Sequence, residues 1–169
     1  MKITGKVWKF AQDDINTGLI RKQMYNHLPP QEQGKHCLES LDPGFAGKAQ
    51  PGDIIVAGKN FGCGSSTPAH YSIAALGIPA IVAESFGKLF FSNCVGGGLW
   101  PVACPGIVGF VNTGESIEFD TGSFQIRNLA TGKTITAQPL PYLYRDMVEA
   151  GGEKAYLKVR LANISKSAP

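Results

Sequence analysis

Residues 58–68 read GKNFGCGSSTP and join the apolar run of residues 54–57, IIVA, to a stretch with helical spacing beyond Pro68. The three glycines allow backbone angles that other residues rarely adopt, so they favour a tight loop. The hydroxyl side chains of residues 65–67 suit the cap of a helix, and a proline suits its first position. The sequence therefore predicts a strand, a glycine-rich loop and a helix that begins near Thr67.

The start of this helix is predicted to bind an anion. Unpaired N–H groups and the positive end of the helix dipole favour a carboxylate or phosphate at Gly64, Ser65, Ser66 and Thr67. The alternative that the loop leaves open is that the serines only cap the helix. Nucleotide binding is poorly supported, because no Gly-Lys-Ser/Thr sequence closes the loop, and residues 62–67 match the dinucleotide fingerprint only in its first two glycines, at Gly62 and Gly64.

A family resemblance follows from this loop. Residues 58–66 resemble the G-x-N-F-G-C-G-S-S loop of the small subunit of 3-isopropylmalate dehydratase, the swivel-domain partner in the aconitase superfamily. The resemblance runs from residues 13–17 (DDINT), similar to the family's D-N-I-D-T-D, through residues 41–45 (LDPGF) to residues 149–152 (EAGG). It implies an α/β fold, a swivelling β/β/α domain with a partly parallel central sheet, flanking helices and an antiparallel C-terminal meander.

The pattern of elements favours the same architecture. Apolar and polar residues alternate as in a half-buried strand over residues 3–10, and turn residues follow at 13–18. Apolar runs that alternate with helices are typical of parallel strands, whose carboxyl ends form ligand sites. We expect strands over 54–57, 78–83, 99–104, 116–120, 124–129 and 134–137, helices over 68–76, 85–95 and 142–150, and a short irregular helix over 31–41, with no prediction for the tail after Lys158.

One domain over residues 1–169 is expected, because a chain of this length buries a sizeable core without disulfides or metals. Within it, residues 21–50 lack strong periodicity, and loops of this length usually form lids or binding segments. We therefore expect a mobile binding segment over residues 21–50, with a flexible surface excursion as the alternative.

Composition excludes several classes of partner. Apolar residues make up 43% of the chain, charged residues 17%, and the net charge is +3. Because there is no polybasic run, neither nucleic acid nor a membrane surface is an expected partner. No stretch is long and apolar enough to span a bilayer, and the N-terminus lacks the apolar core of a signal peptide, so a cytoplasmic location is expected.

The four cysteines do not predict a metal site in this chain. Cys37, Cys63, Cys94 and Cys104 lack C-x-x-C spacing, so a zinc or iron–sulfur site built from this chain alone is not expected. Reduced and mostly buried thiols are the expected state, with Cys63 as the exception because it lies in the loop.

The resemblance also implies roles for the loop residues. Ser65 takes the position of the family's base, which removes a proton next to a carboxylate, and Ser66 that of a serine that holds the substrate. The family's arginine is replaced by Thr67, and a neutral hydroxyl cannot supply the charge and two-pronged geometry of a guanidinium. His70 and Lys59 are candidates to compensate for that charge, although a surface or packing role is the alternative for each.

Residues 19–28 correspond to the wall that faces the substrate in the family. The family's specificity motif there is Tyr-Leu-Arg or similar, whereas this chain has Tyr25, Asn26 and His27. Tyr25 and His27 are therefore predicted to bind substrate, and the departure leaves the substrate's distal group open.

No residue of this chain is a clear electrophile for a leaving hydroxide. The resemblance implies that a separate large subunit carries a four-iron four-sulfur cluster for this purpose, so this chain alone should be inactive. The expected function is the small subunit of a hydro-lyase that acts on 3-isopropylmalate or a related hydroxy acid such as 2,3-dimethylmalate. A non-catalytic anion-binding or assembly module is the alternative, and Thr67 is its best support.

Overall fold

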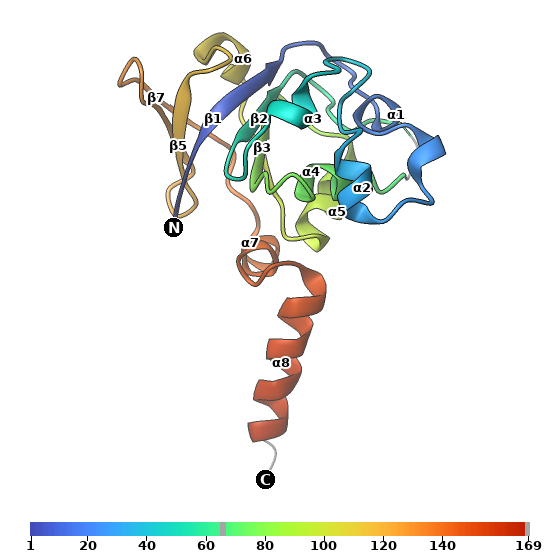
Figure 1. The fold of residues 1–169 in the computed structure, drawn as a ribbon. Helices are drawn as coiled ribbons and strands as arrows, with labels where there is room; N and C mark the ends of the chain where they lie inside the picture. The colour runs from blue at the N-terminus through green and yellow to red at the C-terminus, as the bar shows by residue number, and fades with distance from the viewer. Residues whose placement is uncertain (65–66, 168–169) are drawn as a thin grey trace.

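The fold is built on a seven-stranded sheet in which β1 (Lys2–Phe10) is the middle strand (Figure 1). The computed structural model describes residues 1–64 and 67–167. The strand order is β4-β3-β2-β1-β5-β6-β7. Neighbouring strands are parallel from β4 to β1 and antiparallel from β1 to β7, so β1 belongs to both halves. This confirms the predicted α/β fold with its meander. The other strands are β2 (Ile54–Ala57), β3 (Ala80–Ala83), β4 (Trp100–Ala103), β5 (Ser116–Asp120), β6 (Gln125–Asn128) and β7 (Thr134–Thr136).

β1 serves both halves of the sheet. Its second half, from Val7, pairs in parallel with β2, and its first half, to Lys6, pairs in antiparallel with β5. At Gly5, next to this change of partner, a Cβ atom would overlap the carbonyl oxygen of Gly52. A residue without a side chain is therefore required where the turn before β2 crosses β1.

The sheet separates two hydrophobic clusters. In β2, Ile54 and Val56 belong to one cluster and Ile55 and Ala57 to the other. Because successive side chains of a strand point to opposite faces, the two clusters lie on opposite sides of the sheet. The strands buried on both faces are apolar throughout, which explains why the sequence shows runs rather than alternation there.

Helices cover the sheet and connect its strands (Figure 1). The first three and the 3₁₀ turn lie in the stretch between β1 and β2, and the last one extends away from the sheet. The elements are α1 (Thr17–Ile20), η1 (Gln23–Tyr25), α2 (Pro30–Gly34), α3 (Phe45–Lys48), α4 (His70–Ala74), α5 (Lys88–Gly96), α6 (Ile107–Phe110), α7 (Tyr142–Glu149) and α8 (Glu153–Ser167).

Three predicted helix boundaries were wrong. α4 begins at His70 and not near Thr67, because residues 67–69 form a turn in which the Ala69 N–H donates to the Thr67 carbonyl at 2.7 Å. α5 begins at Lys88 and not at Ser85, because residues 85–87 pair with Phe61. The helix expected over 31–41 ends at Gly34 and continues as turns.

The segment over residues 21–50 has a defined fold in the structure. It contains η1, α2 and α3, and it buries Cys37, Leu38 and Phe45 in the cluster that Ile55 joins. Its expected mobility stays a prediction. Within the part of the chain that the structure describes, no helix is both long and apolar enough to cross a bilayer.

Candidate active site at the carboxyl ends of the parallel strands

Three loops meet where β1, β2 and β3 end. They are residues 11–16 after β1, residues 58–64 after β2 and residues 84–87 after β3. Phe61 pairs with Phe86, and Asn16 pairs with Cys63 as an isolated bridge. The glycine-rich loop is thus tied on both sides, as expected for a ligand site in a parallel sheet.

Acidic residues after β1 hold the glycine-rich loop. One oxygen of Asp13 accepts from the Lys59 N–H at 2.7 Å, and one oxygen of Asp14 accepts from the Asn60 side-chain amide at 2.7 Å. The Asp14 N–H donates to the Lys59 carbonyl at 2.9 Å. The turn predicted at residues 13–18 therefore also fixes the course of the neighbouring loop.

The loop requires glycine at Gly62. Its φ of 76° lies in the left-handed region, and a Cβ atom there would overlap the ring of Phe90. The Gly62 N–H donates to the Ile15 carbonyl at 2.8 Å, and the Cys63 carbonyl accepts from the Thr17 N–H at 3.0 Å. These bonds join the loop to the start of α1.

The predicted residues of the loop divide into two groups. Ser65 and Ser66 lie outside the described residues. Gly64 is exposed with a φ of 92°, and Thr67 is only 8% exposed. Ala69 is the N-cap of the five-residue α4, so the helix does not begin at Thr67 and its N-terminus gives no support for an anion site there. Anion binding by this loop stays a prediction.

His70 cannot supply the expected positive charge near neutral pH. It is the first residue of α4 and is 5% exposed. Burial, together with the charge of Arg21, lowers the pKa of His70 to about 4. Its imidazole is therefore neutral at pH 7, and its Nδ1 is buried and has no hydrogen-bond partner among residues 1–64 and 67–167. Lys59 is exposed, and its backbone is held by Asp13.

Sequence reasoning missed Arg21, which lies close enough to His70 to affect its pKa. This guanidinium is 1% exposed and donates to the side-chain oxygens of Asn26 and Gln33. Its burial has no local signal in the sequence, because the acceptors Asn26 and Gln33 lie five and twelve residues further along the chain.

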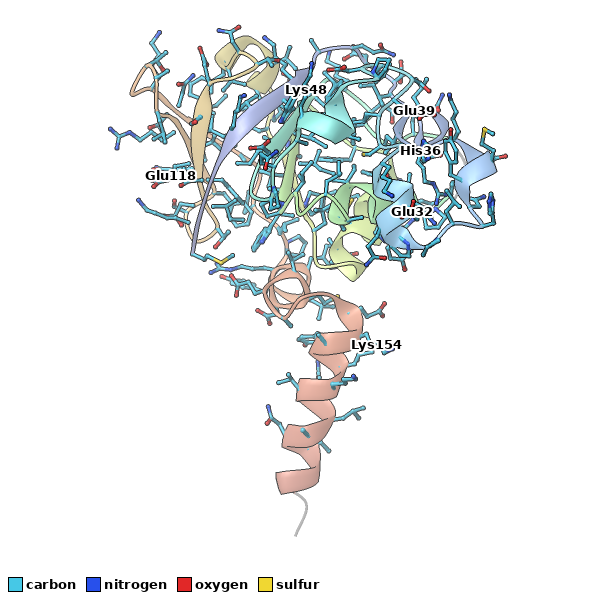
Figure 2. All side chains as sticks on the ribbon, in the orientation of Figure 1. Glu32, His36, Glu39, Lys48, Glu118 and Lys154 are labelled. Carbon is cyan, nitrogen blue, oxygen red and sulfur yellow. The ribbon has the colours of Figure 1, made fainter. Side chains whose placement is uncertain are left out.

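The side chain of Tyr25 is held in one orientation by neighbouring side chains at the surface. Its ring stacks on His36 with centroids 3.8 Å apart, and its hydroxyl donates to Glu39 at 3.0 Å. Glu39 also pairs with Lys22 at 2.9 Å and with His36 at 2.8 Å, and Figure 2 labels His36 and Glu39. His27, predicted to act with Tyr25, is exposed.

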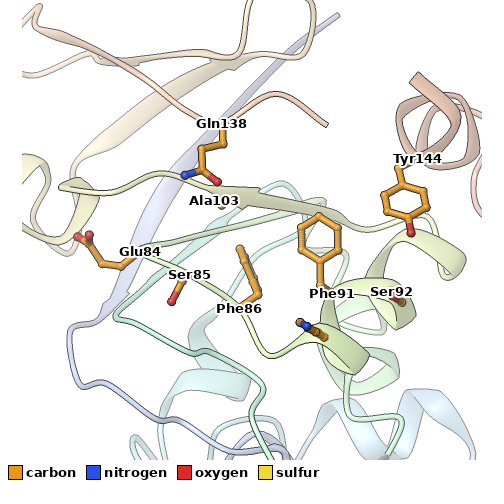
Figure 3. Close-up of a pocket in the computed structure, with 9 residues that line it drawn as sticks. Glu84, Ser85, Phe86, Phe91, Ser92, Ala103, Gln138 and Tyr144 are labelled. Atoms are coloured by element: carbon orange, nitrogen blue, oxygen red, sulfur yellow. The ribbon is translucent and has the colours of Figure 1, made fainter. Parts of the chain in front are cut away.

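A pocket of about 480 Å³ opens beside this site, at the ends of β3 and β4 (Figure 3). Phe86 and Phe91 form its apolar part, and Ser85, Lys88 and Tyr144 add polar groups. The described residues that line it include none of the predicted site residues. Glu84 in its wall accepts the N–H groups of Gly106 at 2.6 Å and Val108 at 3.0 Å, so this carboxylate holds the backbone at the start of α6.

The cysteines are free thiols, as expected. Cys37, Cys94 and Cys104 are buried, and Cys63 is partly exposed. Burial raises the pKa of Cys37 to about 12 and that of Cys104 to about 11. Within residues 1–64 and 67–167, no three His, Cys, Asp or Glu side chains gather as ligands for a metal ion.

Comparison with known proteins agrees with this architecture. The family described as the aconitase C-terminal domain matches residues 2–106. The 3-isopropylmalate dehydratase small subunit of Heliobacterium modesticaldum is 41% identical over 96% of this chain and 98% of its own length. The isopropylmalate/citramalate isomerase small subunit of Methanocaldococcus jannaschii is 38% identical over 95% of this chain and 96% of its own length.

A crystal structure of a Methanocaldococcus jannaschii 3-isopropylmalate dehydratase chain shares the whole fold. Its TM-score is 0.94, its sequence identity is 36%, and the match covers 99% of this chain and 100% of the other. The chain therefore belongs to the family of 3-isopropylmalate dehydratase small subunits, which share the aconitase C-terminal domain.

Proposed function

We propose that this chain is the small subunit of a hydro-lyase that dehydrates or isomerises a small hydroxy-dicarboxylate. 3-Isopropylmalate is the first candidate, and 2,3-dimethylmalate represents related substrates. The proposal depends above all on the loop over residues 58–64, which the Asp13 and Asp14 carboxylates and the Ile15 carbonyl hold at the edge of the parallel strands. Family membership adds the type of reaction, since the relatives are named as dehydratase and isomerase small subunits.

In this proposal Ser65 is the base, and Gly64, Ser66 and Thr67 bind a carboxylate of the substrate. A serine hydroxyl is a poor base in water, so its alkoxide must be stabilised by hydrogen-bond donors in a site from which water is excluded. The buried Thr67 and the tightly bonded Gly62 on either side of the two serines support such a site.

Tyr25 and His27 are proposed to face the distal group of the substrate. Tyr25 has a fixed orientation because Glu39 and His36 hold it, whereas His27 is exposed. Lys59 remains a candidate for positive charge near the loop. His70 does not, because burial keeps its ring neutral at pH 7.

The residues of this chain do not fit a four-iron four-sulfur cluster. Cys104 lies on one side of the sheet and Cys37 and Cys94 on the other, each among buried apolar side chains, whereas Cys63 lies in the glycine-rich loop. Such a cluster is proposed to belong to a large subunit. This chain would then contribute the proton acceptor and the carboxylate-binding loop.

Co-expression with a cluster-bearing large subunit tests the proposal. The complex should dehydrate one or more members of a hydroxy-acid panel under anaerobic conditions, and neither subunit alone should do so. Ser65→Ala should reduce kcat by a factor of about 100 or more, whereas Ser66→Ala should mainly raise KM. A complex in which Ser65→Ala turns over at the wild-type rate would exclude the serine as base. A complex that forms but acts on no hydroxy acid would favour the assembly module instead.

A further inference from the structure

Arg21 is a buried cation without an anionic partner in the described part of the chain. Its Nη1 donates to Gln33 Oε1 and its Nη2 to Asn26 Oδ1, and both acceptors are neutral amides. Its Nε is buried and has no hydrogen-bond partner. The ion pairs of the described residues, which include Lys22 with Glu39, do not involve this guanidinium.

Such an arrangement is costly for the folded chain. Buried charges in proteins are normally paired, because a guanidinium removed from water loses its hydration and neutral amides replace only part of it. Burial lowers the pKa of Arg21, but an arginine stays protonated in proteins. The charge is therefore present, and an anion would stabilise it.

Arg21 is connected to the glycine-rich loop through α1. It is the C-cap residue of this helix, whose first residue, Thr17, donates its N–H to the Cys63 carbonyl. Among the described residues, the Nδ1 of His70 is a second buried nitrogen without a hydrogen-bond partner. Two incompletely bonded polar side chains thus lie on the elements that flank the loop on either side.

The exposed residue next to this guanidinium is Asn26, so a ligand would reach Arg21 by displacing the Asn26 side chain. Asn26, which accepts from Nη2, is itself exposed, and its bond to Arg21 is only partly buried. A carboxylate that displaced the Asn26 amide would form a charge-assisted bond, which is roughly twice as strong as a neutral one. Asn26 lies between Tyr25 and His27, so the route opens among the residues predicted to set specificity.

We propose that Arg21 binds a carboxylate of the small hydroxy-dicarboxylate, which takes the place of the Asn26 amide, with His70 as a neutral neighbour. The ligand class rests on the proposed function, but the binding step requires only this chain. The competing interpretation is structural, because Arg21 joins Asn26 and Gln33 across the turn at Pro29 and Pro30.

Titration of the isolated full-length chain with malate tests the proposal. The Arg21→Met variant should weaken binding by about tenfold or more, and Arg21→Lys, which keeps the charge without the two-pronged geometry, should be intermediate. Lys48→Met is the matched control, since it removes the same charge from an exposed position of the same segment and should leave affinity within about twofold. Asn26→Ala should tighten binding, because it removes the competing acceptor.

Two results would overturn the proposal. One is a folded Arg21→Met chain with wild-type malate affinity, and the other is an Asn26→Ala chain that only loses stability. If Arg21→Met does not fold, the Nε–H resonance of Arg21 in the wild-type chain decides, since it should shift on malate addition and not with uncharged butanediol. An unchanged resonance would show that Arg21 has only a structural role, as the residue that joins Asn26 and Gln33. Failure of the complex to act on hydroxy acids would not alter these binding results.

Discussion

Burial decides the chemistry of His70. The sequence offered this residue as a source of positive charge, because a histidine titrates near neutral pH in water. In the folded chain the ring lies against Tyr71, with centroids 4.1 Å apart, and close to Gly97, where a Cβ atom would be 2.8 Å from its Cδ2. A side chain so enclosed is uncharged at pH 7, so its role can only be that of a neutral hydrogen-bonding group.

Acidification should therefore destabilise the chain partly through His70. In the unfolded chain this imidazole takes up a proton below its ordinary pKa of 6.5, whereas in the folded chain it does so only near 4. The unfolded state binds more protons between these values, so stability falls as the pH falls through this window, by about 3 kcal/mol. Urea unfolding at a series of pH values should show a shallower pH slope for His70→Gln.

The control for this experiment is His27→Gln, at an exposed position. It should leave the pH dependence of stability unchanged. A His70→Gln chain with the wild-type slope would show that His70 is not held neutral by the fold.

Gly62 gives a second prediction for a single residue. Gly62→Ala should destabilise the chain by about 3 kcal/mol or more, because its backbone is left-handed and the added methyl group would overlap Phe90. Gly132→Ala is the matched control. Its φ of 73° is similar, but no atom lies within 4 Å of its Cβ position, so about 1 kcal/mol is expected. If thermal or urea unfolding shows that Gly62→Ala and Gly132→Ala lose the same free energy of unfolding, the ring of Phe90 moves aside for the added methyl group.

Among the elements, α8 is the one that was not predicted, since it forms most of the tail for which no element was expected. Residues 153–167 are rich in Ala, Leu, Lys and Arg, which favour a helix, and Glu153 lies in its first turn. Gly151 and Gly152 separate it from α7 with φ values of 89° and 110°. α8 contacts α5 and α7, and the helix extends away from the body (Figures 1 and 2).

Removal of most of α8 should leave the fold intact. Deletion of residues 158–169 removes the exposed side chains of residues 158–164, such as Val159 at 59%, so Tm should change by less than about 2 °C. Deletion of residues 142–169 is the contrasting variant, since it also removes the buried Val148 from the core. This longer deletion should lower Tm strongly or prevent folding. A large Tm loss in the shorter deletion would show that α8 stabilises the body.

At the scale of the whole molecule, β1 links two cores on opposite faces of one sheet. Trp100 lies in the core that Ile54 joins, and Trp8 packs against the other while its indole N–H donates to Asp53 at 2.8 Å. These are the two tryptophans of the chain. Each therefore reports on one face.

We expect the two faces to unfold together. In Trp8→Phe and in Trp100→Phe, the remaining tryptophan should give a fluorescence midpoint in urea that coincides with the far-UV circular dichroism midpoint of the same variant. Cooperative unfolding follows because each face is built on the strands of one shared sheet. Fluorescence and dichroism midpoints that differ within a variant would show that one face unfolds first.

Local sequence determined the strands and the loop between them. Residues 54–57 form β2 as predicted, because four consecutive apolar residues suit a strand that is buried on both faces. The meander after residue 115 follows from turn residues and short alternating runs. The glycine-rich loop could be placed at the carboxyl edge because parallel order follows from the alternation of strands and helices.

Tertiary structure decided where the helices begin and which charges are buried. α4 and α5 start later than their sequences suggest, because the residues before them form turns or pair with the loop. Arg21 could not be identified as buried, because Asn26 and Gln33 reach it only after the chain has folded back at Pro29 and Pro30. Propensity and periodicity act over a few residues, whereas burial and pKa depend on contacts between distant segments.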